Sequence, residues 1–517
     1  VQVKPTAYWL DGSIKWLLVT FLESVGPKQT VTDHLEYGSQ VRRQEFGSGL
    51  ELKREGAQLT VNTGRLRVTF DTAKSALPTA VSFDTDGGWE QATQSLVATL
   101  KDANGNAFDT LHAPERVEVE ESGPVRTIVK VVGHHQDAAG KPFMAYIIRY
   151  VFTDRQTAFK IYYTWGNDQA SDFTTFKGLS LSLPVASGGK WTTAVDGKGA
   201  TGTGELSLRQ MEDNQCTAAG SGTNPPTRAA GSGTNPPTRA DGWVDVSGAK
   251  TGLCVAVRDF WQLYPKAFEV RDGAVRVDLC PEFAAGTYDK RDTLEEIKLY
   301  YYLLNGQYKV RQGVQKQHEL LIYPHGGQMR GDVQREATVF QEPLIATCTP
   351  ERYCGTKVFG DILPATAGRS AEYERICENV HRAYTTNRDA SRNFGMLNFG
   401  DQFGERRINW ANGEYDHHHA FLMQYIRTGD RKWYFLGEKA ARHAIDVDTC
   451  HYGPRLGGEW IHAMGHTGGY YTKDPFGGLG ISGGGFSPSH TWTEGFCDWF
   501  ALSGDVTASE NAALVAD

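Results

Sequence analysis

Short runs that alternate apolar and polar residues fill the chain from Val1 to about Ile322. They are rich in β-branched and aromatic residues, and turns of Gly, Asp, Asn and Pro separate them. Alternation with a period of two predicts antiparallel strands that bury one face. Examples of such runs are 14–22, 65–71, 126–135, 143–152, 158–165, 179–185, 252–260, 275–280 and 296–304. Strands in this number predict a large antiparallel β-sandwich region over residues 1–342, built as one double sheet or as two modules.

Turn residues support this prediction. Asp86-Gly87-Gly88 and Asp272-Gly273 each join two strand-like runs, and such dipeptides favour tight hairpin turns. The segment AAGSGTNPPTR occurs at 218–228 and again, unchanged, at 229–239. Its composition predicts an exposed loop without a core of its own, because Gly, Ser, Thr and Pro offer little to bury.

The apolar spacing changes to three and four after a predicted linker at 343–365. Residues 369–387 have helical spacing, and 414–430 reappears in outline as 489–505, with Gly429-Asp430 aligned on Gly504-Asp505. Gly suits the end of one helix and Asp the start of the next, so each copy predicts a helical hairpin. Repeated hairpins stack into a solenoid or close into a toroid over residues 366–517. We expect the inner helix ends and their loops to line a cleft.

Composition narrows the function classes. The chain has 517 residues, of which 40% are hydrophobic and 22% charged, which is typical of a globular protein with several full cores. A net charge of −8 and the lack of a basic run argue against a nucleic-acid partner. No run approaches the ~18 apolar residues of a membrane span, so we expect no membrane partner. The oligomeric state stays open.

Eight cysteines in a chain of this length do not indicate a disulfide scaffold. Cys348 and Cys354 are close enough in sequence for a small loop bridge, and Cys254 and Cys280 lie in strand-like runs that could be neighbours. The alternative is that these residues are buried free thiols.

Three segments of the helical part combine glycine with aromatic and titratable residues. This composition is typical of loops that let a sugar approach the backbone and stack on aromatic rings. We expect the three to converge on one cleft. They are 399–419, 457–471 and 483–492.

The histidines of these segments do not predict a metal site. Side chains of adjacent helical residues point in different directions, so His417, His418 and His419 cannot all bind one ion. His462 and His466 have the spacing i, i+4, but Ala463 stands where a zinc peptidase carries Glu. We therefore predict no metal or other cofactor; a need for Ca²⁺ stays open, although no motif supports it. His418 shares a stripe with Leu422 and could face the cleft or belong to the core.

The run AYWLDGSIKWLLVTF at 7–21 resembles the N-terminal signature of exo-type rhamnogalacturonan lyases and their YetA-like relatives. That family carries a similar run in a β domain ahead of a helical toroid, and the order of regions in this chain is similar. The resemblance implies a β-sandwich followed by an α/α toroid, which is expected to be incomplete at its C-terminus. Ulvan lyases with this organisation are similar as well. The resemblance thus implies a secreted or periplasmic enzyme acting on an acidic polysaccharide.

Cleavage of a uronic-acid polymer by β-elimination needs three groups: one that neutralises the carboxylate, a base for the C5 proton, and an acid for the leaving oxygen. The resemblance assigns no catalytic residue securely to this chain, so we select residues by their chemistry. The candidates that would neutralise the carboxylate are Arg406, Arg407 and Asn409. The candidate base is His418 or His419, and the candidate acid is Tyr470 or Tyr471. His466 and His490 are alternates for these catalytic roles. Substrate-binding candidates are Trp410, Trp460, Trp492 and Glu494.

Two other functions remain open. A glycoside hydrolase on the same toroid would use a pair of carboxylates ~5–10 Å apart. Carboxylates available for this role are Asp401, Glu405, Glu414, Asp416, Glu459 and Glu494. A non-catalytic carbohydrate-binding protein would keep the aromatic residues without needing the titratable ones.

Overall fold

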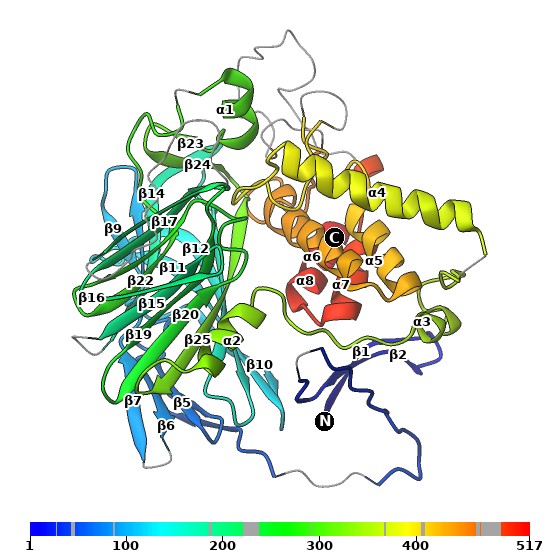
Figure 1. Ribbon diagram of the computed structural model, residues 1–517, viewed down its shortest axis with the longest axis horizontal. Helices are drawn as coiled ribbons and strands as arrows, with labels where there is room; N and C mark the ends of the chain where they lie inside the picture. The colour runs from blue at the N-terminus through cyan, green and yellow to red at the C-terminus, as the bar shows by residue number, and fades with distance from the viewer. Residues whose placement is uncertain are drawn as a thin grey trace.

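The structure is a computed structural model that describes residues 1–517 except 27, 43–46, 86–87, 186–188, 221–236, 290, 367–368, 405–408, 462–465 and 467–487. Strands gather on one side of the molecule and helices α4 to α8 on the other (Figure 1). A separate hairpin of β1 (Gln2–Tyr8) and β2 (Ile14–Thr20) lies on the helical side near α3. The predicted fold class, an antiparallel β-sandwich followed by helical hairpins, is confirmed.

Two antiparallel sheet systems build the sandwich. The smaller has five strands, β3 (Glu51–Glu55), β4 (Gln58–Asn62), β5 (Leu66–Asp71), β6 (Ala80–Asp84) and β7 (Trp89–Gln94). The larger links eighteen strands. They are β8 (Val97–Asp102), β9 (Ala107–Asp109), β10 (Arg116–Ser122), β11 (Arg126–Gln136), β12 (Pro142–Thr153), β13 (Phe159–Gly166), β14 (Phe173–Pro184), β15 (Lys190–Val195), β16 (Lys198–Thr203), β17 (Leu206–Glu212), β18 (Gln215–Gly220), β19 (Ala240–Ser247), β20 (Thr251–Val257), β21 (Lys266–Arg271), β22 (Ala274–Cys280), β23 (Leu303–Leu304), β24 (Gln307–Arg311) and β25 (Gln315–Gly326).

Strand β25 is central to the larger sheet. It pairs with β13 on one side and β20 on the other, and almost all its residues are buried. The predicted Asp272-Gly273 turn joins β21 to β22, and both residues have the positive φ of a tight hairpin turn, 52° and 69°. Asp86 and Gly87 lie outside the described residues, as does most of the duplicated loop.

One predicted strand is wrong. Part of the run 296–304 forms the helix α1 (Thr293–Leu299), and only Leu303–Leu304 is a strand. Asp292 caps the helix, because its side chain accepts a hydrogen bond from the backbone nitrogen of Leu294 at 3.0 Å. Glu295 and Glu296 then favour the first turn through the helix dipole. The acidic cap therefore outweighs the β propensity of the tyrosines that follow.

The helices follow the sandwich in chain order. They are α2 (Gly331–Val339), α3 (Pro350–Gly355), α4 (Ala371–Ala390), α5 (His417–Thr428), α6 (Arg431–His443), the π-helical turn η1 (Ala444–Asp448), the 3₁₀ turn η2 (Pro488–His490), α7 (Glu494–Ser503) and α8 (Val506–Ala516). Helix α2 lies within the range predicted as β and α3 within the predicted linker, while the domain boundaries 342 and 365 stay predictions. None of the described helices is long and apolar enough to cross a bilayer.

The internal repeat is confirmed. Gly429 and Gly504 end α5 and α7 with nearly equal left-handed φ angles of 70° and 71°. Asp430 and Asp505 then cap α6 and α8, each accepting a backbone hydrogen bond two residues on. The two hairpins share one apolar core with α3.

Polar contacts hold the helices against the sandwich. Lys316 of β25 donates to Asp446 of the π-helical turn at 2.8 Å, and Lys130 of β11 donates to Glu510 of α8 at 2.5 Å. All eight cysteines are free, so the disulfide alternative is wrong. The alternative of buried free thiols is confirmed for Cys254, Cys280 and Cys354, whereas Cys348 is free but exposed.

Candidate active site

Three loop segments meet at the N-terminal end of α5. The Trp492 indole nitrogen donates to the carbonyl oxygen of Gly413 at 2.9 Å, and its backbone nitrogen donates to Glu459 Oε2 at 3.1 Å. His490 Nδ1 lies 3.3 Å from the carbonyl oxygen of Glu414. The predicted convergence of these segments is therefore present among the described residues.

Glu459 is the titratable group at the centre of this meeting point. Its side chain is buried, and burial raises its pKa to about 8, with Asp448 and Asp416 adding to the rise. The hydrogen bond from Trp492 opposes that shift without cancelling it. Glu459 is therefore protonated near neutral pH, and a protonated carboxyl can donate a hydrogen bond to an anion.

A second, deeper group lies beside it. Asp401, His443 and His466 form one buried cluster, and the buried Asp448 lies beside its two histidines. Burial raises the pKa of Asp401 to about 7 and that of Asp448 well above its usual range. Burial also lowers the pKa of His443 to about 4. The environment thus disfavours charge on every member, which is unusual for neighbouring acids and bases.

The neighbouring histidines His418 and His419 have different environments. His418 is 6% exposed, its ring packs 4.7 Å from the ring of Phe496, and it leaves no room for a side chain at Gly495. His419 has a side chain that is 41% exposed, and its Nδ1 lies 2.6 Å from Asp498 Oδ2. That hydrogen bond raises the pKa of His419, while burial lowers the pKa of His418. Of the two, His419 is the one that a substrate can reach.

The predicted substrate-binding residues also differ in how far they are exposed. Trp410 is fully buried with its ring 4.3 Å from that of His466, and Trp460 is buried with the guanidinium of Arg311 over its ring at 4.3 Å. Both rings are therefore enclosed by protein. Trp492 is half-buried and Glu494 is exposed in the first turn of α7. These two remain available to a sugar.

Other predicted residues are placed only in part. Asn409 is buried, and its side-chain amide donates to the carbonyl oxygen of Trp410 at 3.1 Å. Arg406, Arg407, Tyr470 and Tyr471 lie outside the described residues, as does Glu405 of the hydrolase alternative.

Sequence reasoning missed His443, Asp448 and Asn412. His443 and Asp448 lie at the end of a run that reads as an ordinary helix, and nothing in the letters ARHAIDVD marks a change of pitch. The π-helical turn that brings them together ends with a hydrogen bond from Thr449 N to Ala444 O at 3.0 Å. Such turns are frequent at functional sites.

Two domain models of one family match the chain. The PcRGLX-like protein central beta sandwich domain matches residues 50–192, and the PcRGLX-like protein C-terminal alpha/alpha toroid domain matches residues 343–469. Together they cover just over half of the chain. The chain belongs to the PcRGLX-like family. The resemblance seen in the sequence is confirmed, and the cluster of Asp401, His443, Asp448 and His466 lies within the stretch that matches the PcRGLX-like toroid domain.

Among curated proteins, the uncharacterized protein YetA of Bacillus subtilis (strain 168) is 27% identical over 193 residues. The match covers 36% of this chain but only 22% of that relative. This PcRGLX-like chain therefore corresponds to a limited part of YetA.

Solved structures resemble the chain weakly. A galactose mutarotase-like protein from Lactobacillus casei ATCC 334 is 12% identical with a TM-score of 0.28, covering 52% of this chain and all of its own. A glycosyl hydrolase family 38 protein from Enterococcus faecalis is 12% identical with a TM-score of 0.35, covering 59% of this chain and 34% of its own. Scores this low carry no information about the function of this PcRGLX-like protein.

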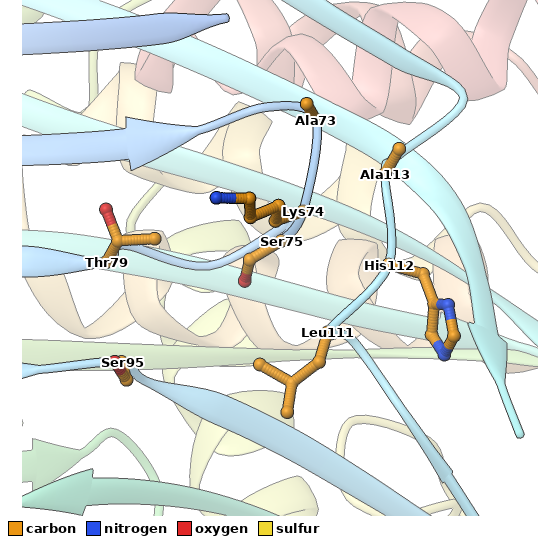
Figure 2. Close-up of a pocket in the computed structure, with 8 residues that line it drawn as sticks. All are labelled: Ala73, Lys74, Ser75, Thr79, Ser95, Leu111, His112 and Ala113. Carbon is orange, nitrogen blue, oxygen red and sulfur yellow. The ribbon is translucent and has the colours of Figure 1, made fainter. Parts of the chain in front are cut away.

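A surface depression of about 450 Å³ lies on the sandwich (Figure 2). Its lining comes from loops between strands, and Figure 2 shows Lys74 and His112 on two neighbouring loops. None of the predicted site residues lines it. We therefore place the candidate active site of this PcRGLX-like protein at the meeting point of the three loops.

Proposed function

We propose that this chain is part of a polysaccharide lyase that cleaves a uronic-acid polysaccharide, rhamnogalacturonan-like or ulvan-like, by β-elimination. Membership of the PcRGLX-like family indicates a carbohydrate-active protein. The observation that carries the proposal is the contact of Trp492 with both Gly413 and Glu459, because it gathers titratable groups and an accessible indole at one point.

The proposed site supplies a neutral donor for the substrate carboxylate. Uronate C5–H becomes acidic when its carboxylate is hydrogen-bonded or neutralised. Glu459 has a pKa of about 8 and is protonated below that pH, so it can donate to the carboxylate. Arg406 or Arg407 would add positive charge there. Their proposed role rests on the sequence.

The proposed base is His419 or His490. The hydrogen bond to Asp498 raises the pKa of His419, so His419 would act as a base only above that raised pKa. His419 is the more exposed of the two, and His490 has a side chain that is 27% exposed. His418 is less suited, because its ring is enclosed by Phe496 and Gly495. Tyr470 or Tyr471 would protonate the leaving oxygen, a role that rests on the sequence. Trp492 would stack on a sugar ring.

The test is incubation of the chain with rhamnogalacturonan, with ulvan, and with a uronate-free polysaccharide. β-Elimination creates a conjugated unsaturated uronate, so ultraviolet absorbance should rise with the acidic polymers alone. His490→Ala and His419→Ala are compared with Glu372→Gln on the exposed face of α4. Loss of the base should lower turnover by ~10²-fold or more, and the control should keep it.

Two results would assign another function. Release of reducing ends without absorbance would indicate hydrolysis by paired carboxylates. Binding to the polymer without any turnover, unchanged in both histidine variants, would indicate a non-catalytic carbohydrate-binding protein.

A further inference from the structure

Four buried side chains aim donor atoms at one small volume. Asp401 lies in a loop, His443 ends α6, Asp448 ends the π-helical turn, and His466 lies in the following loop. Their exposed fractions are 5%, 2%, 3% and 0%. They come from separate parts of the toroid domain, and the ring of His466 lies 6.1 Å from that of Tyr301, which precedes β23 of the sandwich.

The donor atoms of Asp401, His443 and His466 all lie within 4.8 Å of one another, and Asp448 lies beside the two histidines. His443 Nε2 lies 3.2 Å from His466 Nδ1, 3.8 Å from Asp401 Oδ2 and 3.3 Å from Asp448 Oδ2. His466 Nδ1 lies 3.4 Å from Asp401 Oδ2 and 3.7 Å from Asp448 Oδ1. A tetrahedral ion with bonds of ~2.0–2.2 Å to nitrogen and oxygen sets its ligands ~3.4 Å apart. The spacing of Asp401, His443 and His466 is close to that geometry. Asp448 approaches His443 with Oδ2 and His466 with Oδ1, so it would be the fourth ligand through one of these oxygens.

The cluster also has no cationic side chain, among the described residues, that would balance two ionised carboxylates. In the part of the chain that the structure describes, the carboxyl groups of Asp401 and Asp448 lie close to the two histidine rings, and no Lys or Arg forms an ion pair with either carboxyl group. The nearby Lys316 forms an ion pair with Asp446 instead. Two buried carboxylates without a cation are costly, and one divalent ion neutralises both.

The surrounding backbone already orients the donors. The π-helical turn sets His443 and Asp448, five residues apart, on the same side of the chain. Asn412 donates from its backbone nitrogen to Asp401 Oδ2 at 3.0 Å and from its side chain to Asp448 Oδ1 at 2.5 Å. Gln402 N donates to Asp401 Oδ1 at 2.7 Å. Hydrogen bonds of this kind orient ligands around protein-bound metals.

We propose that Asp401, His443, Asp448 and His466 bind one divalent transition-metal ion. Two imidazoles and two carboxylates suit Zn²⁺ and related ions, whereas Ca²⁺ and Mg²⁺ prefer oxygen ligands alone. Four protein ligands in a buried, closed site are typical of a structural ion. The ion would hold the loops of Asp401 and His466 against the end of α6, close to the candidate active site. The proposal departs from the cofactor-free prediction made from the sequence and is independent of the lyase proposal.

The competing account is a network in which the same side chains share protons without any ion. The two accounts predict different amounts of metal bound to the purified protein. The full chain is purified without chelator, and bound metal is measured by elemental analysis. We expect one metal ion per chain, a melting temperature that falls by several degrees with chelator and recovers with Zn²⁺, and visible absorption bands of tetrahedral Co²⁺ after exchange with cobalt.

His466→Gln and Asp448→Asn should lose the bound ion and the response of the melting temperature to chelator. His135→Gln is the matched control, because His135 is also fully buried in the sandwich, where it bonds to Tyr163 at 2.7 Å. This variant should lose stability and keep the ion. The wild-type measurements stand even where a ligand variant does not fold.

Wild-type protein without metal above the buffer level, and without a response of melting temperature or spectrum to Zn²⁺ and Co²⁺, would overturn the proposal in favour of proton sharing. Equal loss of metal in His135→Gln and His466→Gln would likewise show that the ion is held elsewhere.

Discussion

Arg258, directly after β20, and Glu438, in α6, form a two-point ion pair across the boundary between sandwich and helices. The guanidinium donates to the two carboxylate oxygens at 2.6 and 2.8 Å, and both side chains are buried. Burial alone would raise the pKa of Glu438, but Lys439, Arg258 and Arg442 outweigh it and hold the pKa at about 2. The pair therefore fixes how α6 sits on the sheet, and with it the position of His443.

Glu438→Gln should destabilise the protein by ~3 kcal/mol, because it removes one of the two carboxylates to which the buried Arg258 donates and leaves Glu319. Urea unfolding measures the loss. Glu372→Gln on α4 is the control, since that side chain is 71% exposed and a surface change of this kind costs less than ~0.5 kcal/mol. Equal losses in the two variants would contradict the role given to the pair.

Gly400→Ala should be far more damaging than Gly429→Ala, although both glycines have positive φ angles, 114° and 70°. A methyl group at Gly400 would collide with the Lys439 carbonyl oxygen and lie 2.7 Å from His443 Cβ. At Gly429 the nearest atom is Pro350 Cγ at an ordinary 3.5 Å. We expect a loss of ~1 kcal/mol for Gly429→Ala and several times that for Gly400→Ala, measured by thermal unfolding. Similar losses would mean that the loop before Asp401 can move away from α6.

The architecture was predictable because it depends on local patterns. Alternation with a period of two marked most strands of the sandwich, and the Gly-Asp pairs marked both helical hairpins through their caps. The error at 296–304 arose where a cap at Asp292 competed with β propensity. Propensity is a weak signal there, since Tyr300, Tyr301 and Tyr302 are fully buried although they lie outside any strand.

The contribution of His134 to the free energy of unfolding should fall as pH rises. Its ring bonds to Asp168 at 2.7 Å and to Glu115 at 2.5 Å, and the bond to Asp168 is the main reason that its pKa rises to about 9. A folded-state pKa above the unfolded value of ~6.5 gives stability that is complete below pH ~6.5 and is lost as pH rises through about 9.

The comparison is between wild type and His134→Gln, unfolded with urea at several pH values. Wild type should be the more stable of the two at pH 6, with the difference shrinking steadily and nearly gone above pH 9. A difference that stays constant over this range would mean that His134 stabilises the fold by packing rather than by charge.

The site was predictable only as a region. Its three segments were recognisable from glycine, aromatic and titratable residues, and Trp492 does join them. Which side chains face a substrate was not recognisable, because burial is set by packing between distant segments. The sequence predicts that Trp410 and Trp460 stack on sugars. In the structure their rings contact His466 and Arg311 instead. His443 and Asp448 come together only through a π-helical turn.

His418→Ala tests this limit directly. Helical spacing alone allowed the ring of His418 to project into a cleft, in which case its loss would cut turnover by ~10²-fold and leave stability unchanged. The structure places the ring between Phe496 and Gly495, 6% exposed. Its removal opens a cavity between α5 and α7, so we expect a loss of ~2 kcal/mol or more in thermal or urea unfolding. Turnover per folded molecule should stay near the wild-type value. His419→Ala changes the next residue, whose side chain is 41% exposed. It should show the reverse, with a smaller change in stability and a large loss of turnover. Should His418→Ala instead lose turnover at full stability, the ring must reach the substrate despite its burial, and His418 is the base.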